Sequence, residues 1–194
     1  MTISIDGAAN TITGLAVDGL PAGTVGTATL AAAAVTPVKQ SQPLTLGTAI
    51  ATTSGTSHDF TGIPSWVKRI TVICDGVSTN GISIPQIQIG SGSIDAASYL
   101  GSAFTANTNN TANSTGFLLG GTSAAVYARH GHVVLTLIGS NKWGCSVTLG
   151  DTNTAVHVGG GSKTLSGTLD RIRLTTVNGT DTFDAGSINI MYEG

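Results

Sequence analysis

Few residues of this chain could carry chemistry, and only two groups of them lie close together in the sequence. Four histidines and ten acidic residues are spread over 194 positions. The first group is His130-Gly131-His132, a spacing found among metal ligands, and the second is Asp181 with Asp184. A pair of carboxylates is what glycoside cleavage requires. Both groups therefore have to be weighed against plainer interpretations.

The histidine pair is a candidate metal site only if several copies of the chain combine. Alternate side chains of a strand share a face, so His130 and His132 would point to the same side. Three copies around one axis would present six imidazole nitrogens, enough for octahedral coordination of a divalent metal. The simpler interpretation, which we favour, is two surface histidines beside Arg129. The sequence thus predicts no metal site, and His58 and His157 have no partner that spacing identifies.

No arrangement in the sequence predicts an enzyme. Asp181 and Asp184 flank a phenylalanine in a predicted turn, instead of facing each other across a cleft. The segment Gly159–Thr164 has a serine, Ser162, where a phosphate-binding loop requires the glycine before its lysine, and it is expected to be a flexible hairpin loop. No Gly-x-Ser-x-Gly elbow precedes a helix. We predict no catalytic residues and no cofactor.

The chain carries little charge for its length. Charged residues make up 9% of it, against about 25% in typical globular domains, while the net charge is -2 and the mean hydropathy is +0.27. Its surface must then be rich in Thr, Ser, Asn and Gly. Burying part of such a surface between subunits keeps it out of water. We therefore expect a homo-oligomer.

The charge and apolar patterns also exclude several classes of partner. Basic residues are scattered, so the chain lacks the basic stripe that nucleic acid requires. The longest apolar run, Leu30–Val35, is far shorter than the roughly 18 residues of a membrane span. The first basic residue, Lys39, follows this run, which predicts no secretory signal. Cys74 and Cys145 are expected to be buried thiols, with a single bridge between them as the alternative.

Two segments of different character must position these residues. In residues 1–43 the apolar positions follow neither a helical nor a strand period, which predicts an extended Gly/Ala/Thr-rich arm that orders against sister chains or a docking surface. From Leu44 onward, short apolar runs alternate with Gly, Asn, Asp and Ser. This pattern predicts one all-β domain, residues 44–194, with a jelly-roll-like antiparallel β-sandwich fold.

Alternation within the predicted strands assigns their faces. Ile70, Val72 and Cys74 share one face of a strand and should lie in the core, as should Trp143 on another strand. The opposite faces are more apolar than a monomer requires. We predict that four residues of these faces lie at an interface between subunits, which the resemblance described next implies is that of a trimer: Val67, Ile73, Val134 and Ile138.

The stretch from Phe60 to Gly81 carries a resemblance to a known group of proteins. It reads FTGIPSWVKRITV, followed after three residues by GVSTNG. This wording resembles a module of bacteriophage and prophage fibres and other virion surface proteins. The Thr-Ala-x-Leu-Ala phrase at Thr27–Ala31 is similar to their attachment and shaft regions. The resemblance implies a virion location, a trimer, and an arm docked on other virion proteins of the capsid or tail.

One predicted loop is long and polar enough to contact a partner of such a particle. It spans residues 106–115 and contains four asparagines: Asn107, Asn109, Asn110 and Asn113. Loops of this length without secondary structure are mobile or functional. These four residues are candidates for contact with a host surface glycan, together with the segment Gly159–Thr164.

These features predict a non-enzymatic structural protein of a phage particle, made in the host cytoplasm and displayed on the virion surface. A head fibre or capsid decoration protein is favoured, because the chain is short and only 5% aromatic. The alternative is a tail fibre that recognises a host surface glycan. A polysaccharide depolymerase is the third option, disfavoured for want of paired carboxylates.

Overall fold

The computed structural model describes residues 4–6, 11–13, 42–106 and 110–194. The chain divides into two compact units, Met1–Ser41 and Gln42–Gly194, against a boundary after residue 43 expected from the sequence. In the first unit, β1 (Ser4–Asp6) pairs antiparallel with β2 (Thr11–Thr13). The other predictions for the arm lie outside the described residues.

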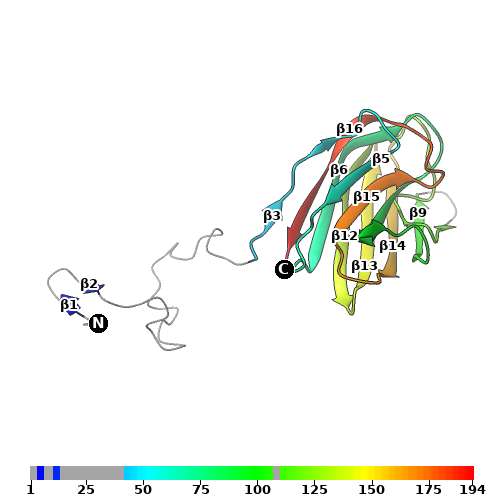
Figure 1. Cartoon of the computed structure of the whole chain (residues 1–194). Coiled ribbons are helices and arrows are strands. Elements are labelled where there is room, and N and C mark those ends of the chain that lie inside the picture. Colours follow the sequence, from blue (N-terminus) through cyan, green and yellow to red (C-terminus); the bar gives the residue numbers. More distant parts are fainter. Residues whose placement is uncertain (1–3, 7–10, 14–41, 107–109) are drawn as a thin grey trace. The chain divides into compact units, whose positions relative to one another are not determined.

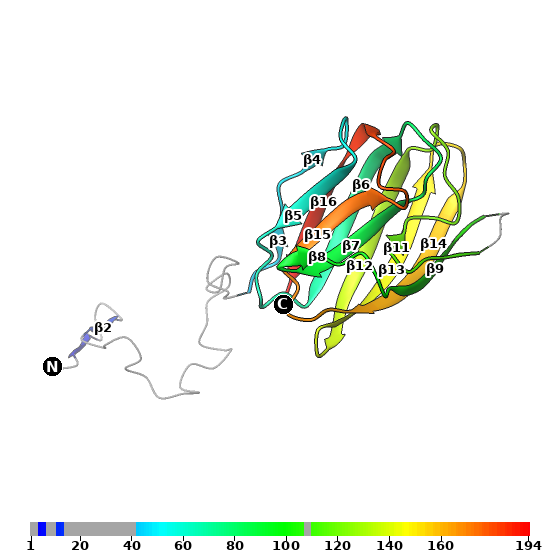
Figure 2. The same ribbon diagram turned by 45° about the vertical axis from the view of Figure 1, so that its right-hand side comes forward.

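The second unit is a β-sandwich of two antiparallel sheets (Figure 1, Figure 2). The larger sheet contains β3 (Thr45–Leu46), β4 (Ile50–Ala51), β6 (Arg69–Thr79), β9 (Leu100–Thr105), β10 (Thr111–Ala112), β12 (Arg129–Gly139), β13 (Lys142–Asp151), β14 (Val156–Thr164) and β16 (Phe183–Glu193). The smaller sheet contains β5 (Ser57–Thr61), β7 (Pro85–Ser91), β8 (Ser93–Ile94), β11 (Phe117–Leu118) and β15 (Arg171–Thr176). The prediction of an all-β, sandwich-like domain is confirmed.

No helix occurs among the residues that the structure describes. A helical segment long and apolar enough to cross a membrane is accordingly not found among them either.

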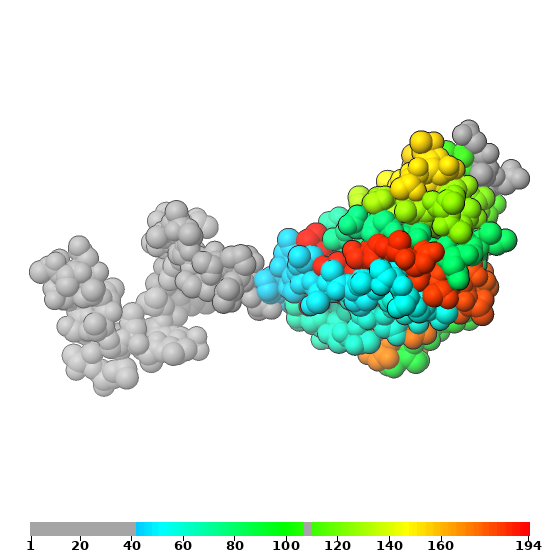
Figure 3. Space-filling model, turned by 90° about the horizontal axis from the view of Figure 1, so that it is seen from above, coloured from blue at the N-terminus to red at the C-terminus, as the bar shows by residue number. Residues whose placement is uncertain are grey.

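Neighbouring strands are often far apart in the sequence. The larger sheet has nine strands in the order β10-β9-β14-β13-β12-β6-β16-β3, with β4 also paired to β16. The smaller has five in the order β11-β7-β15-β5, with β8 paired to β7. The chain therefore crosses repeatedly between the sheets, and β16 (red) lies beside the segment that begins at Gln42 (cyan) in Figure 3.

The core lies between the two sheets, where alternation predicted it. Ile70, Val72 and Cys74 of β6 are buried, and Trp143 of β13 is 2% exposed. Burial of an aliphatic side chain such as Ile70 or Val72 contributes about 1.5–3 kcal/mol to the free energy of unfolding. The two cysteines are free thiols, so the alternative of a bridge is not realised. Burial raises the pKa of the Cys74 thiol to about 12.

Val67 corrects one prediction. Extending the alternation of β6 backward predicts that Val67 lies on the outer face, but it is buried in the core of its own chain. The strand begins only at Arg69, and a turn precedes it in which the Val67 N–H donates to the Pro64 carbonyl at 3.1 Å. The turn breaks the period of two and rotates Val67 inward, so it cannot contact a neighbouring chain.

Glycines mark the irregular points of the larger sheet. The pairing of β12 with β6 shifts between Arg129 and Gly131, whose φ is 128°. The pairing of β16 with β6 shifts on either side of Ala185, next to Gly186, whose φ is 86°. A Cβ at Gly186 would lie 2.3 Å from the backbone of Gly76. Only glycine allows these two strands to approach so closely.

Candidate functional site

The outer face of the nine-stranded sheet carries little charge and mixes apolar residues with uncharged polar ones. One row of paired residues crosses it from β6 to β9: Ile73, His132, Thr148, Val158 and Phe104. The adjacent row consists of Thr71, Val134, Ser146, Gly160 and Ser102. Exposed aliphatic residues lie beside these rows, with Ile138 64% and Leu100 72% exposed. This outer face, defined by the two rows with Ile138 and Leu100, is called the apolar face below.

Three of the four predicted interface residues lie on the apolar face. Ile73 and Val134 are half-buried, and Ile138 is exposed. The ion pair of Arg69 with Glu193, at 3.2 Å, lies at the ends of β6 and β16 and not among the apolar rows. A broad sheet face without central charge is unusual on the surface of an isolated monomer.

The histidine pair lies at one end of the apolar face. His130 and His132 are both exposed on β12, on the same side of the strand. The Gly76 N–H donates to Nδ1 of His130 at 3.1 Å, and a carboxylate oxygen of Asp75 lies 3.2 Å from the same nitrogen. Within the described part of the chain, no group of three or more His, Cys, Asp or Glu residues could hold a metal ion.

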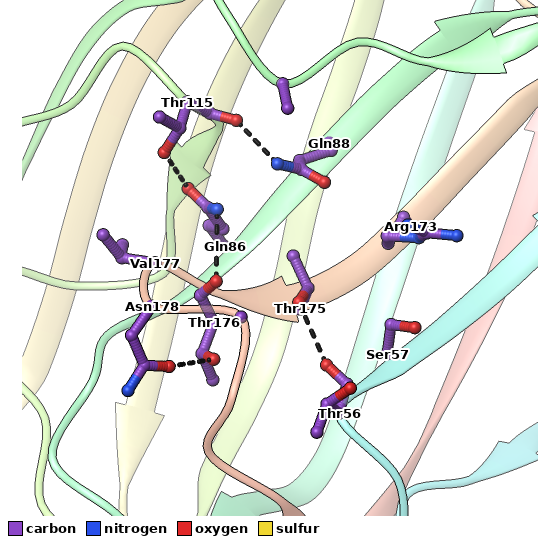
Figure 4. A pocket seen from close by; sticks show the side chains of 12 residues that line it. Thr56, Ser57, Gln86, Gln88, Thr115, Arg173, Thr175, Thr176, Val177 and Asn178 are labelled. Carbon is purple, nitrogen blue, oxygen red and sulfur yellow. Dashed lines mark hydrogen bonds between the residues drawn. The ribbon is translucent and has the colours of Figure 1, made fainter.

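The opposite side of the sandwich, the outer face of the smaller sheet, is polar throughout its centre. Thr175 of β15 stands between Gln86 of β7 and Ser57 of β5. In the next row Arg173 stands between Gln88 and Asp59. A cavity of about 320 Å³ opens over these rows (Figure 4). We call it the polar cavity; its wall is completed by Thr56, Ala96, Thr115 and residues 176–179.

The floor of the polar cavity is held rigidly by hydrogen bonds. Gln86 and Gln88 are 1% and 6% exposed, because the segment around Thr115 covers them. The Gln88 amide N–H donates to the Thr115 carbonyl at 2.8 Å, and the Asn113 amide N–H donates to Gln86 Oε1 at 2.7 Å. The Thr175 hydroxyl donates to the Thr56 carbonyl at 3.0 Å. Each contact is local to the cavity, as Figure 4 shows for the pairs drawn with dashed lines.

A second polar group is buried inside the sandwich. Nε2 of His157 donates to the Asp151 carboxylate at 2.9 Å, and Nδ1 lies 2.9 Å from the Thr105 hydroxyl. The Thr105 oxygen also accepts the N–H groups of Gly121 and Thr122, at 2.9 and 3.2 Å. The Arg129 guanidinium donates to the Thr122 carbonyl at 2.9 Å. His157 and Arg129 are fully buried.

Burial and hydrogen bonds shift the titration of this group. Burial lowers the pKa of His157, although its bond to Asp151 opposes the shift. Burial alone would raise the pKa of Asp151, but hydrogen bonds from Ala155, His157 and Asn153 together lower it. Asp151 is therefore a carboxylate and His157 a neutral imidazole at neutral pH.

An Asp–His–Thr series of this kind has the order of a hydrolytic triad, but its surroundings indicate a structural role. Thr105 is 3% exposed, and its oxygen already accepts two backbone N–H groups. A nucleophile must be able to reach a substrate atom. The group instead fastens the segment that includes Gly121 and Thr122 to β9, β12, β13 and β14.

The structure changes the interpretation of the predicted loops. Gly159–Thr164 is not a loop, because it forms most of β14 between β13 and β9. Its glycines permit close strand approach, since a Cβ at Gly161 would lie 2.4 Å from the Leu100 carbonyl oxygen. Asn110 is exposed, whereas Asn113 is half-buried and bonded to Gln86. Asn107 and Asn109 lie outside the described residues.

Asp181 lies in the connection between β15 and β16, and Asp184 lies at the start of β16. Both carboxylates accept hydrogen bonds. Asp181 accepts the Ser83 N–H at 2.8 Å and the Asn178 amide at 2.7 Å. Asp184 accepts the Ser78 hydroxyl. Both carboxylates are thus engaged by the chain's own donors.

Comparison of the chain with models of protein families, with curated proteins and with solved structures finds no match.

Proposed function

We propose that this chain is a non-enzymatic structural protein of a bacteriophage particle. Three copies assemble through the apolar face, and the arm of residues 1–43 attaches the assembly to another virion protein, on the head as a fibre or decoration. The observation that carries the assembly is the breadth of the uncharged apolar face. The virion location rests on the wording of Phe60–Gly81.

The size of the apolar face fits an interface between copies. Six neighbouring strands, from β9 to β16, lie side by side in the larger sheet. With a spacing of about 4.8 Å and about eight residues a strand, they offer an area on the order of 700 Å². A standard interface takes about 800 Å² from each partner. One such face therefore offers about the area of one standard contact, which in a trimer each chain shares between its two neighbours.

The strand order supports a jelly roll as part of the same proposal. Eight strands form two sets of four, β4-β16-β6-β12 in the larger sheet and β5-β15-β7-β11 in the smaller. Numbered one to eight along the chain, the strands have the order 1-8-3-6 in the larger sheet and 2-7-4-5 in the smaller, which is the arrangement of two Greek keys. The strands β9, β10, β13 and β14 then widen the larger sheet, and they add Leu100, Phe104 and Val158 to the apolar face.

Light scattering of the purified full-length chain tests the assembly. We expect a mass three times the 19.3 kDa of one chain. Ile138→Lys places a charge at an exposed position of the apolar face and should give a mass of one chain with its fold intact. Ser57→Lys, on the outer face of the smaller sheet, is the control and should remain trimeric. A wild-type mass of one chain at micromolar concentration contradicts the proposal.

Mass spectrometry of purified particles tests the location. The chain should be found in intact particles, and its removal should lower their resistance to heat or osmotic shock. Binding of the labelled residues 42–194 to host cells, without any change in particle stability, would instead favour the alternative of a receptor-binding tail fibre.

A further inference from the structure

The polar cavity combines features that a structural sheet face does not need. Its floor residues Gln86, Gln88 and Thr175 are all at least nine-tenths buried. Apolar side chains would fill such covered positions without any need for hydrogen-bond partners. Here the covered positions are amides and a hydroxyl, and a cavity of about 320 Å³ remains above them. This volume lies at the lower end of the range for small-molecule sites.

The cavity presents neutral groups that both donate and accept hydrogen bonds. Within the described part of the chain, neither Oε1 of Gln88 nor the hydroxyl of Ser57 has a hydrogen-bond partner. Figure 4 shows the Gln88 oxygen on the side away from Thr115, toward the open space beside Thr175 and Arg173. These groups border the cavity together with the exposed Thr56. The Asn178 side chain beside them already bonds to Thr176, Thr180 and Asp181.

The one cation of the cavity is already neutralised. Arg173 makes two parallel bonds to Asp59, from Nε to Oδ1 and from Nη2 to Oδ2, each 2.7 Å long. A ligand carboxylate or phosphate would have to compete with Asp59 for the guanidinium and would be repelled by it. The lining therefore disfavours anions and suits a neutral ligand.

We propose that the polar cavity binds a neutral saccharide of one or two rings. Adjacent hydroxyls of a sugar donate and accept at once, which matches amide and hydroxyl groups that do the same. None of the twelve lining residues, all of them described, is aromatic, so no ring stacks on the sugar. The affinity rests on hydrogen bonds alone and is expected on the order of a millimolar Kd. This site lies on the sheet face opposite to the apolar face and does not depend on the assembly.

Saturation-transfer NMR on the full-length chain tests the site. The probes are glucose, galactose and N-acetylglucosamine, each titrated to about 50 mM, well above the expected Kd, and N-acetylneuraminic acid is the anionic comparison. At least one neutral sugar should give a saturable signal at least several-fold stronger than the anionic sugar. Ser57→Phe, which fills the cavity mouth from an exposed position, and Gln88→Leu should both abolish it.

Thr61→Phe is the matched control, because Thr61 is an exposed residue on the same side of the same edge strand, outside the cavity lining. This variant should bind as the wild type does. Ser57→Phe keeps the floor intact, so it tests the site even if Gln88→Leu fails to fold. The proposal is overturned if no neutral sugar gives a saturable signal, if Ser57→Phe binds as the wild type does, or if only the anionic sugar binds.

Discussion

His157 shows what residue spacing alone can and cannot indicate. The sequence offers no partner for it, because Thr105 precedes it by 52 positions and Arg129 lies on a third strand. The pairing of β14 with β13 and β9, together with the pairing of β12 with β13, brings the group together. Asp151 is six residues away, across the β13–β14 turn, and that spacing is the one signal that could have pointed to the contact.

Asp151→Asn is predicted to lower the free energy of unfolding by about 2–4 kcal/mol, since it removes a buried charge that accepts several hydrogen bonds. Urea unfolding measures this loss. Asp75→Asn, at an exposed carboxylate, is the control and should change the free energy by less than about 0.5 kcal/mol. Equal effects of the two substitutions would contradict the role assigned to Asp151.

The lowered pKa of His157 predicts a stability that falls with acid. Below its ordinary pKa of 6.5 the unfolded chain binds a proton at His157, while the folded chain does not. The free energy of unfolding should therefore drop between pH 7.5 and 5.5, by at most about 1.4 kcal/mol per pH unit for this group. His157→Gln should flatten the dependence of the unfolding free energy on pH. Part of the slope should remain, because burial also lowers the pKa of His58. A variant profile as steep as that of the wild type would exclude His157 as the source.

At the scale of elements, the alternation of apolar and polar residues predicted the faces of the strands better than it predicted where the strands begin and end. Ile73, Val134 and Ile138 lie on the outer face as predicted, because side-chain period follows directly from the pleat. The predictions for Val67 and for Gly159–Thr164 were wrong for one common reason. A turn before β6 rotates Val67 inward, and the glycines of β14 allow neighbouring strands to approach instead of forming a loop. Both features depend on neighbouring parts of the fold, which a local sequence pattern does not contain.

Two glycines with positive φ provide a matched test of this strand approach. Gly186→Ala should cost at least about 3 kcal/mol of unfolding free energy, since it adds a backbone clash to the left-handed strain. Gly62→Ala has a φ of 74° and nothing within 4 Å of its Cβ. It should cost only about 1 kcal/mol.

Urea unfolding of both glycine variants gives the comparison. Similar losses in the two proteins would show that β6 and β16 relax around Gly186 and do not require glycine there.

At the scale of the whole molecule, the two sheets have different outer faces. The nine-stranded sheet presents rows of apolar and uncharged polar residues, and the five-stranded sheet presents amides, hydroxyls and a neutralised ion pair. The sequence predicted two-sided apolar strands but not this division, because strand order depends on pairings such as that of β6 with β16, more than 100 residues apart. The division separates a surface suited to self-association from a surface suited to a small polar ligand.

Cysteine labelling of the assembled protein tests the central claim most directly. Ser146 lies in the middle of the apolar face and Ser57 on the opposite face, and both are exposed in the single chain. If copies pack through the apolar face, Ser146→Cys should react with a maleimide about tenfold or more slowly than Ser57→Cys, because labelling must wait for dissociation or local opening. Equal rates for the two cysteines would show that the apolar face is open to solvent and would contradict the assembly proposed for this protein.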